Sequence, residues 1–198
     1  WAGPLGGVGA VRRYPASDHG LPARYARAIA TYRNADLRQA LVQIDALIQA
    51  QPNNPYFYEL KGQALLEGGR PAEAVAPLRQ ASQLAHENPL IEIMLAQALN
   101  ATNNPKFAEE AVGLLRSAIA REPEAPEAYS QLAMAYGRKG DLANADLASA
   151  QAAFARGDVK TARQLATRAK TRLPIGSPAW VQADDIVNVK SNANARMQ

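Results

Sequence analysis

The sequence contains no cysteine, so disulfide bonds and thiolate metal sites are excluded, while the redox compartment stays undetermined. Aromatic residues make up only 6% of the 198 residues, which leaves few side chains for stacking on nucleic-acid bases. No apolar run approaches the roughly 20 residues that a membrane-spanning helix needs. The sequence therefore predicts no membrane span and gives no sign of a nucleic-acid partner.

Histidine is almost as scarce, because only His19 and His86 occur, far apart in the chain. A helical zinc site of the H-E-x-x-H type needs two histidines four residues apart, and this sequence has none. Without cysteine, and without a plausible serine, histidine and acid set, nucleophilic catalysis has no support either. We therefore predict no catalytic residue, no metal ligand and no cofactor, and no enzymatic activity for this chain.

The net charge of +4 is mildly basic. The densest basic stretch is Lys160, Arg163, Arg168, Lys170 and Arg172, and no aromatic residue is interleaved with it. A nucleic-acid site usually combines a concentrated basic patch with such aromatics. We interpret the stretch as a solvated helix face whose cations lie near a helix C-terminus.

What the chain does have is alanine, the best helix former, within a hydrophobic content of 47%. A period of about 34 residues is also visible. In the segment 55–88, the pattern predicts a helix over Pro55–Glu67, a turn at Gly68-Gly69-Arg70 and a helix from Pro71 to about Ala85. Small or apolar residues stand at the offsets typical of tetratricopeptide (TPR) repeats, at Gly62, Ala64, Gly69, Ala74, Leu78 and Ala81.

The same offsets fit further segments, and proline marks the ends of their predicted helices. The predicted repeats are 21–54, 55–88, 89–125 with three extra residues near Asn103, then 126–157 and an overlapping 143–176. The last two overlap because Gly140-Asp141 recurs as Gly157-Asp158 after only 17 residues. One helix, Leu142 to Arg156, should therefore serve both repeats. We expect an irregular N-terminal arm over 1–20, a capping helix over 177–190 and a disordered tail over 191–198.

These patterns predict an all-α, right-handed α-solenoid of about five TPR-like hairpins, with the shared helix and the capping helix included. The alternative is a generic alanine-rich helix bundle. Such a bundle would show a period of 3.6 residues but no correspondence between distant segments. The correspondence from Leu21 to Pro174 favours the solenoid.

In a TPR solenoid the first helix of each hairpin lines the concave surface, where a peptide or protein segment binds. Taking residues about one turn apart on these helices predicts a binding groove. Its members are Tyr25, Ile29, Tyr32, Tyr56, Glu59, Gln63, Leu66, Leu90, Ile93, Gln97, Asn100 and Met134. The alternative is that Tyr25, Tyr32 and Tyr56 pack against the N-terminal arm or a neighbouring domain.

Some strings carry a more specific resemblance. RRYPASD, LPARYARAIATYR, AQPNNPYFYELKGQALLEGGRPAEA and FARGDVKTARQLATRAKTRLPIGSPAWVQADDI resemble the C-terminal half of α-proteobacterial M48-family zinc metalloproteases, over roughly Val11 to Val189. The zinc-binding helix of that family has no counterpart in this sequence, so no catalytic residue is carried over. The resemblance implies the TPR module of such a protease, excised or encoded alone. Its implied compartment is the periplasm, and its implied partners are an M48 catalytic domain or outer-membrane assembly proteins.

Three functions remain open at this stage. The chain could recruit substrates or assembly partners for an envelope protease, it could act as a regulatory lid on the protease domain, or it could be a stand-alone TPR scaffold. All three make it a non-catalytic protein–protein interaction module.

Overall fold

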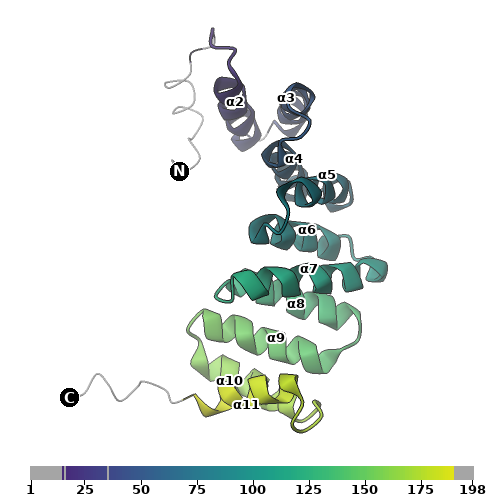
Figure 1. The fold of residues 1–198 in the computed structure, drawn as a ribbon, viewed down its shortest axis with the longest axis vertical. Coiled ribbons are helices and arrows are strands. Elements are labelled where there is room, and N and C mark those ends of the chain that lie inside the picture. Colours follow the sequence, from purple (N-terminus) through teal and green to yellow (C-terminus); the bar gives the residue numbers. More distant parts are fainter. Residues whose placement is uncertain (1–14, 16, 35, 190–198) are drawn as a thin grey trace, which may run out of the picture. The chain divides into compact units, whose positions relative to one another are not determined.

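The computed structural model describes residues 15, 17–34 and 36–189, and all regular structure within them is helical (Figure 1). The predicted tail over 191–198 lies outside the described residues, and so do residues 1–14 and 16 of the predicted arm over 1–20. The helices are α2 (Leu21–Arg33), α3 (Leu37–Ala50), α4 (Pro55–Glu67), α5 (Pro71–Ala85), α6 (Pro89–Ala101), the 3-10 helix η1 (Pro105–Phe107), α7 (Ala108–Arg121), α8 (Pro126–Arg138), α9 (Leu142–Ala155), α10 (Val159–Lys170) and α11 (Pro178–Asn188). No described helix has the length and apolar character that crossing a membrane requires.

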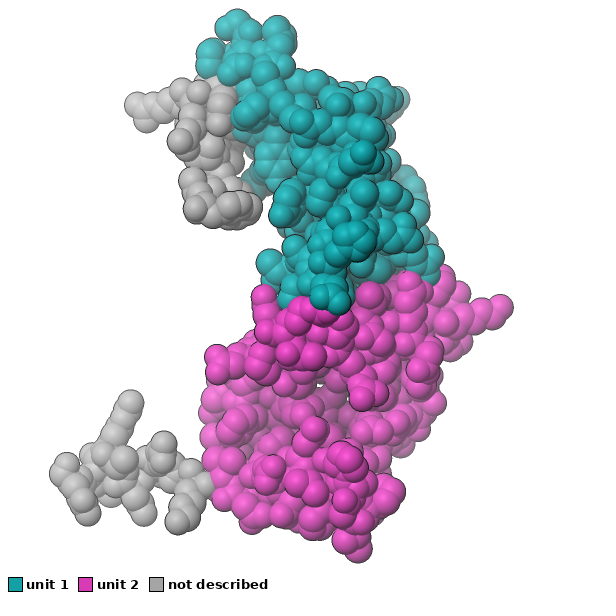
Figure 2. Space-filling view, viewed as in Figure 1, with its two compact units in different colours: residues 1–98 teal, residues 99–198 magenta. Residues whose placement is uncertain are grey.

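The chain forms two compact units, residues 1–98 and residues 99–198, and the boundary falls inside α6 (Figure 2). Within each unit, helices that follow one another in the sequence pack together: α2 with α3, α3 with α4 and α4 with α5 in unit 1, and α7 through α11 in unit 2. This is the TPR-like, all-α arrangement of antiparallel helices that the repeat pattern predicts.

The helix boundaries follow from local chemistry. The side chains of Asp36, Asp141 and Asp158 each accept a hydrogen bond from the backbone N–H three residues later, so they cap the starts of α3, α9 and α10. The turns before α5, α9 and α10 contain Gly69, Gly140 and Gly157 at φ values of 73°, 75° and 81°. Glycine adopts this left-handed backbone without a steric penalty, so each turn can reverse the chain within a few residues.

Unit 1 has a core between α2, α3 and α4. It is built from Ala28, Ile44, Leu47, Phe57, Leu60 and Ala64, all at most 6% exposed. Between α4 and α5, Gly62 lies against the fully buried Leu78, and a Cβ at Gly62 would fall 2.3 Å from Leu78 Cγ. The glycine therefore sets how closely α4 and α5 approach.

Unit 2 contains the helix that two repeats share. α9 packs on α8, on α10 and on α11. Its residues Leu147, Ala150 and Ala153 join one core with α10 and α11 that also contains Ala162, Ala166, Ala169, Leu173, Ala183 and Ile186. The predicted shared helix, Leu142 to Arg156, agrees with the observed Leu142–Ala155.

The capping helix is α11, which begins where the Ser177 side chain accepts a hydrogen bond from Trp180 N at 3.2 Å. Trp180 and Val187 pack against the core of unit 2, and Ile186 is buried within it. Val181, in contrast, is 46% exposed. The three extra residues of the third repeat accompany η1, which follows Asn103 with its positive φ of 55°.

Candidate functional site

A pocket in unit 1 combines exposed apolar surface with amide groups. Its volume is about 540 Å³, which is within the range of small-ligand and side-chain pockets. The lining comes from α2, from α4 and from the start of α6. The lining residues are Tyr25, Asn54, Tyr56, Phe57, Glu59, Leu60, Gln63, Asn88 and Leu90. We refer to this set as the unit 1 pocket.

α4 supplies most of the wall because residues three, four and seven apart share one helix face. Tyr56, Glu59 and Gln63 have this spacing. The face is fixed at its start by Asn54, whose Oδ1 accepts a hydrogen bond from Tyr56 N at 3.1 Å. Asn88 does the same one repeat later, accepting from Leu90 N at 3.1 Å. Both asparagines therefore orient the first turn of a helix and border the pocket.

The apolar part of the pocket is partly fixed and partly open. The rings of Tyr25 and Phe57 lie with centroids 5.8 Å apart at 37°, and Phe57 is only 5% exposed. This pair joins the pocket to the core of unit 1 and holds its floor in place. Tyr56 and Leu90, by contrast, are 55% and 62% exposed. Two large apolar side chains thus remain available for a partner.

The electrostatics of the pocket depend on Glu59. None of the lining residues is a lysine, an arginine or a histidine. Burial raises the pKa of Glu59 above its ordinary value. Burial also raises the pKa of Tyr25, and the negative charge of Glu59 adds to that rise. The pocket therefore holds a half-buried carboxylate beside an aromatic ring, with no cation in its lining.

The raised pKa of Glu59 predicts a pH effect on stability. An acid with a raised pKa binds its proton more tightly in the folded chain, so its contribution to stability falls as the pH rises from the ordinary glutamate pKa through the raised one. At neutral pH, Glu59→Gln should therefore raise the melting temperature. The gain should shrink below the ordinary glutamate pKa, as thermal melts monitored by circular dichroism would report.

The matched control for this melt is Glu67→Gln, which removes an exposed carboxylate from the same helix. It should change the melting temperature little at any pH. A gain from Glu59→Gln that stays the same at acidic and neutral pH would contradict the assignment of the penalty to the ionised carboxylate.

Five of the predicted groove residues come together at the unit 1 pocket: Tyr25, Tyr56, Glu59, Gln63 and Leu90. The others do not line it. Ile29 and Tyr32 pack against the core of unit 1, Leu66 is half-buried, and Gln97 is exposed but stands outside the lining. Met134 is 45% exposed and belongs to unit 2.

Two of the predicted groove residues are buried and leave the candidate site. Ile93 is 8% exposed and Asn100 is 2% exposed. Asn100 Nδ2 donates hydrogen bonds to both the backbone and the side-chain oxygen of Gln131 at 3.0 Å, so its amide has an internal structural role. These two side chains are not presented to a partner at the surface.

Sequence reasoning missed four lining residues: Asn54, Phe57, Leu60 and Asn88. The two asparagines carried a usable signal. Each precedes a proline that opens a first helix, and they are one repeat of 34 residues apart. Phe57 and Leu60 carried no such signal, because core residues of a helix reach a pocket only where two neighbouring helices diverge.

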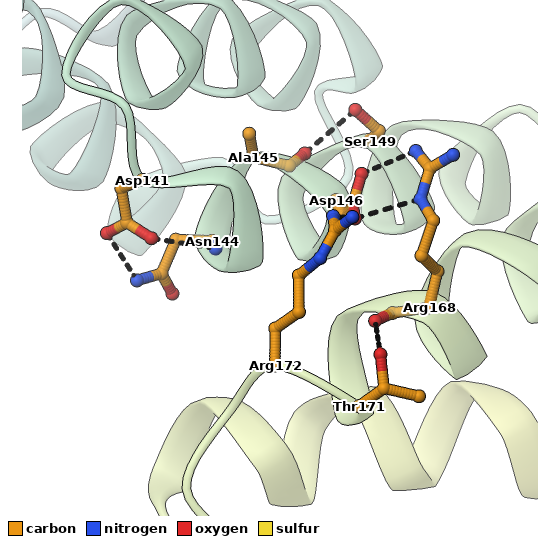
Figure 3. A network of polar contacts seen from close by, with 8 residues as sticks. All are labelled: Asp141, Asn144, Ala145, Asp146, Ser149, Arg168, Thr171 and Arg172. Carbon is orange, nitrogen blue, oxygen red and sulfur yellow. Dashed lines mark hydrogen bonds and ion pairs between the residues drawn. The ribbon is translucent and has the colours of Figure 1, made fainter.

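The basic stretch in α10 has partners that the sequence interpretation did not foresee. Arg168 donates from Nε to Asp146 Oδ2 at 2.9 Å, and Arg172 donates to the same oxygen at 2.5 Å (Figure 3). Asp146 lies on α9 with its side chain only 10% exposed. Lys170 pairs with Asp184 of α11 and lies 4.4 Å from the ring centroid of Trp180. The predicted position near a helix C-terminus is confirmed for Arg168 and Lys170, and the side chains of Arg168 and Arg172 both stay about half exposed, but the expectation lacked the ion pairs through which these cations join α9, α10 and α11.

No group of three or more histidine, aspartate or glutamate side chains that could hold a metal ion occurs in the part of the chain that the structure describes. Two further hollows lie in unit 2. They share Tyr129, Gln151 and Gln182.

Comparisons with known proteins agree with the fold. A family model described as "Psidin, N-terminal TPR repeats region" matches residues 30–153. MamA from Desulfovibrio magneticus RS-1 superposes with a TM-score of 0.66 at 17% identity, covering 86% of this chain and 95% of that chain. TTC0263, a thermophilic TPR protein of Thermus thermophilus, superposes with a TM-score of 0.52 at 14% identity, covering 86% and 100%. At such identities these structures show the fold alone.

A curated relative is named "Beta-barrel assembly-enhancing protease" in Yersinia pestis. It is 26% identical over 179 residues, which are 90% of this chain. The chain spans 36% of the length of that relative. The likeness therefore concerns one part of a longer protein.

Proposed function

Because the chain belongs to the family of the Psidin N-terminal TPR repeats region, whose scaffold is typical of protein–protein interaction, we propose that it is a non-catalytic module holding a segment of a partner protein in the unit 1 pocket. The observation that carries this proposal is the exposure of Tyr56 and Leu90, 55% and 62%, beside the amides of Asn54, Gln63 and Asn88. Apolar anchors filling such a pocket, with amides holding backbone groups around them, are what peptide recognition uses.

The partner class comes from the relative. The protein in Yersinia pestis named as a β-barrel assembly-enhancing protease resembles 90% of this chain with 36% of its own length. This supports a role in recruiting envelope proteins to an M48-type protease, with the periplasm as the compartment and outer-membrane assembly proteins as partners. The catalytic domain of such a protease would be a separate region, since no zinc-binding motif is present in this sequence.

Tyr56 gives the direct test of the pocket. Tyr56→Ala removes an exposed aromatic anchor without disturbing the core, and loss of such anchors typically costs a few kcal/mol of binding. We expect at least a roughly tenfold weaker affinity, which corresponds to about 1.4 kcal/mol. The measurement is fluorescence anisotropy with overlapping peptides that cover the sequence of an outer-membrane β-barrel protein.

The matched control is Val42→Ala, which removes a 66% exposed apolar side chain of α3 that does not line the pocket. Its affinity for the same peptides should stay at the wild-type value. If Tyr56→Ala and Val42→Ala bind every peptide equally well, the pocket is not the binding site.

A second function is favoured by the same relative, because that relative is itself a protease. According to this second function, the chain docks on the protease domain as a regulatory lid. Mixing the chain with an M48 catalytic domain and measuring both binding and peptidase rate distinguishes the two. Tight binding to the catalytic domain with a changed peptidase rate supports the lid. Binding only to unfolded outer-membrane proteins supports recruitment. If neither kind of binding occurs, the stand-alone scaffold is the remaining function.

A further inference from the structure

The Glu59 carboxylate is an exception among the acidic side chains of unit 1. Asp45 pairs with Lys61 at 2.7 Å, Glu73 pairs with Arg70, and Glu67 accepts a hydrogen bond from Gln63 at 2.9 Å. Glu59 is half-buried, yet among the described residues neither a hydrogen bond nor an ion pair offsets the burial of its carboxylate. A partly desolvated charge without a partner is unfavourable. A cation that pairs with it would therefore gain more binding free energy than a cation that pairs with an exposed carboxylate.

The surroundings of Glu59 suit a particular kind of cation. The rings of Tyr25, Tyr56 and Phe57 line the same pocket. Aromatic faces attract ammonium and guanidinium groups, and they also pack against the methylene stems that carry those groups. The amides of Gln63, Asn54 and Asn88 are neutral and do not compete with the carboxylate for the charge.

Unit 2 of the same chain already contains a cation that is paired with a carboxylate and lies near an aromatic ring. Lys170 pairs with the Asp184 carboxylate while its ammonium nitrogen lies 4.4 Å from the ring centroid of Trp180. A lysine, a carboxylate and an aromatic ring thus come together between α10 and α11. The unit 1 pocket has the carboxylate and the rings, and its lining has no cation.

We propose, resting on the function proposed above, that the unit 1 pocket selects partner segments by a lysine or arginine residue whose charged group pairs with Glu59 and whose stem lies against the rings of Tyr25 and Tyr56. The pocket then selects a basic residue flanked by apolar residues, because Leu90 offers an exposed apolar contact in the same lining as Glu59. Acidic segments are excluded by repulsion from the same carboxylate.

The probe is a set of peptide mixtures with one fixed central residue, lysine, arginine, leucine or glutamate, and flanks randomised among uncharged residues. Affinity for the full chain is measured by fluorescence anisotropy. The lysine and arginine mixtures should bind most tightly and the glutamate mixture least. Glu59→Gln should weaken binding of the basic mixtures on the order of tenfold, as loss of a charge-assisted hydrogen bond does, while binding of the leucine mixture changes little.

Glu67→Gln is the matched control, since it removes the same charge from α4 outside the pocket lining. If Glu67→Gln weakens binding as much as Glu59→Gln does, non-specific attraction of basic peptides to negative charge on α4 explains the preference, and the inference is overturned. Equal binding of the leucine and lysine mixtures overturns it too, while the proposed function survives provided Tyr56→Ala still weakens both. If no mixture binds, the proposed function fails with it.

The sequence also contains a basic pair of its own, Arg12 and Arg13, so the test must distinguish an external basic residue from an internal one. The variant carrying Arg12→Ala and Arg13→Ala separates this case. If the lysine mixture binds that variant alone and not the wild-type chain, the pocket belongs to an internal segment and selection of an external partner is overturned. Equal binding to both chains supports the external partner.

Discussion

Gly62→Ala is expected to destabilise the chain by about 1–3 kcal/mol, although alanine is the better helix former. The reason is steric. A Cβ at this position would lie 2.3 Å from Leu78 Cγ and 2.5 Å from Leu78 Cδ2, and Leu78 is completely buried, so the leucine has no free space to move into. Urea unfolding monitored by circular dichroism would measure the loss as a lower midpoint at unchanged slope.

Gly113→Ala is the internal comparison for this substitution. Gly113 also lies inside a helix, but a Cβ there would meet nothing within 4 Å. Alanine should therefore stabilise α7 by about 0.5–1 kcal/mol through helix propensity alone. Opposite signs at the two glycines are the result to look for, and a stabilising Gly62→Ala would refute the close approach of α4 and α5.

A double-mutant cycle makes the steric cause specific. Leu78→Ala alone should cost about 2–5 kcal/mol, because it removes a fully buried leucine. In that background the atoms that Gly62→Ala would strike are absent, so the second substitution should cost little or nothing. The coupling energy between the two positions is then the energy of the clash.

Asp146→Ala is expected to cost about 2 kcal/mol of unfolding free energy. Asp146 is nearly buried, at 10% side-chain exposure, and it accepts hydrogen bonds from both Arg168 and Arg172 (Figure 3). The two arginine side chains are 56% and 45% exposed, so water can solvate them once the carboxylate is gone. For this reason we expect a smaller loss than for an ion pair that is buried on both sides.

Asp45→Ala provides the surface counterpart of Asp146→Ala. Asp45 makes one ion pair, with Lys61, and its side chain is 48% exposed. Such pairs are worth at most about 1 kcal/mol. The two variants can be ranked in the same urea titration, and hydrogen exchange should place the loss for Asp146→Ala in α9 and α10. Equal losses would mean that Asp146 acts as an ordinary surface carboxylate.

Proline and glycine made most helix boundaries predictable. The expected helices Pro55–Glu67 and Pro71–Ala85 have the bounds observed for α4 and α5, because proline marks each start and the Gly68-Gly69 turn separates them. The shared helix was predictable from the repeated Gly-Asp pair, since each aspartate caps a helix. These signals are local in the chain, which is why one sequence suffices to find them.

The site was only partly predictable, because spacing alone does not say which face of a helix is open. On α6 the prediction chose Leu90, Ile93, Gln97 and Asn100. The structure instead exposes Leu90, Gln97 and Ala101 with Met94 half-buried between them, whereas Ile93 and Asn100 are buried. Steps of three from Leu90 and Gln97 turn the helix toward its packed side, and steps of four remain on the open stripe.

The partners of the charged groups could not be predicted from the sequence for another reason. Asp146 meets Arg168 and Arg172, which stand 22 and 26 positions later on or just after another helix. Glu59 lies in a pocket whose lining contains no cation, while the neighbouring Lys61 pairs with Asp45 of another helix. Pairing between helices depends on how they pack, and the repeat pattern does not determine it.

The double use of α9 limits how the chain can be shortened. Leu147, Ala150 and Ala153 depend on α10 and α11 for their cover, while α9 also closes the hairpin with α8. A chain cut after Ala155 would expose these three residues to water, and a chain cut before Leu142 would uncover α8. A shortened chain must therefore either keep or remove the last two repeats together, although the sequence pattern shows them as two separate repeats.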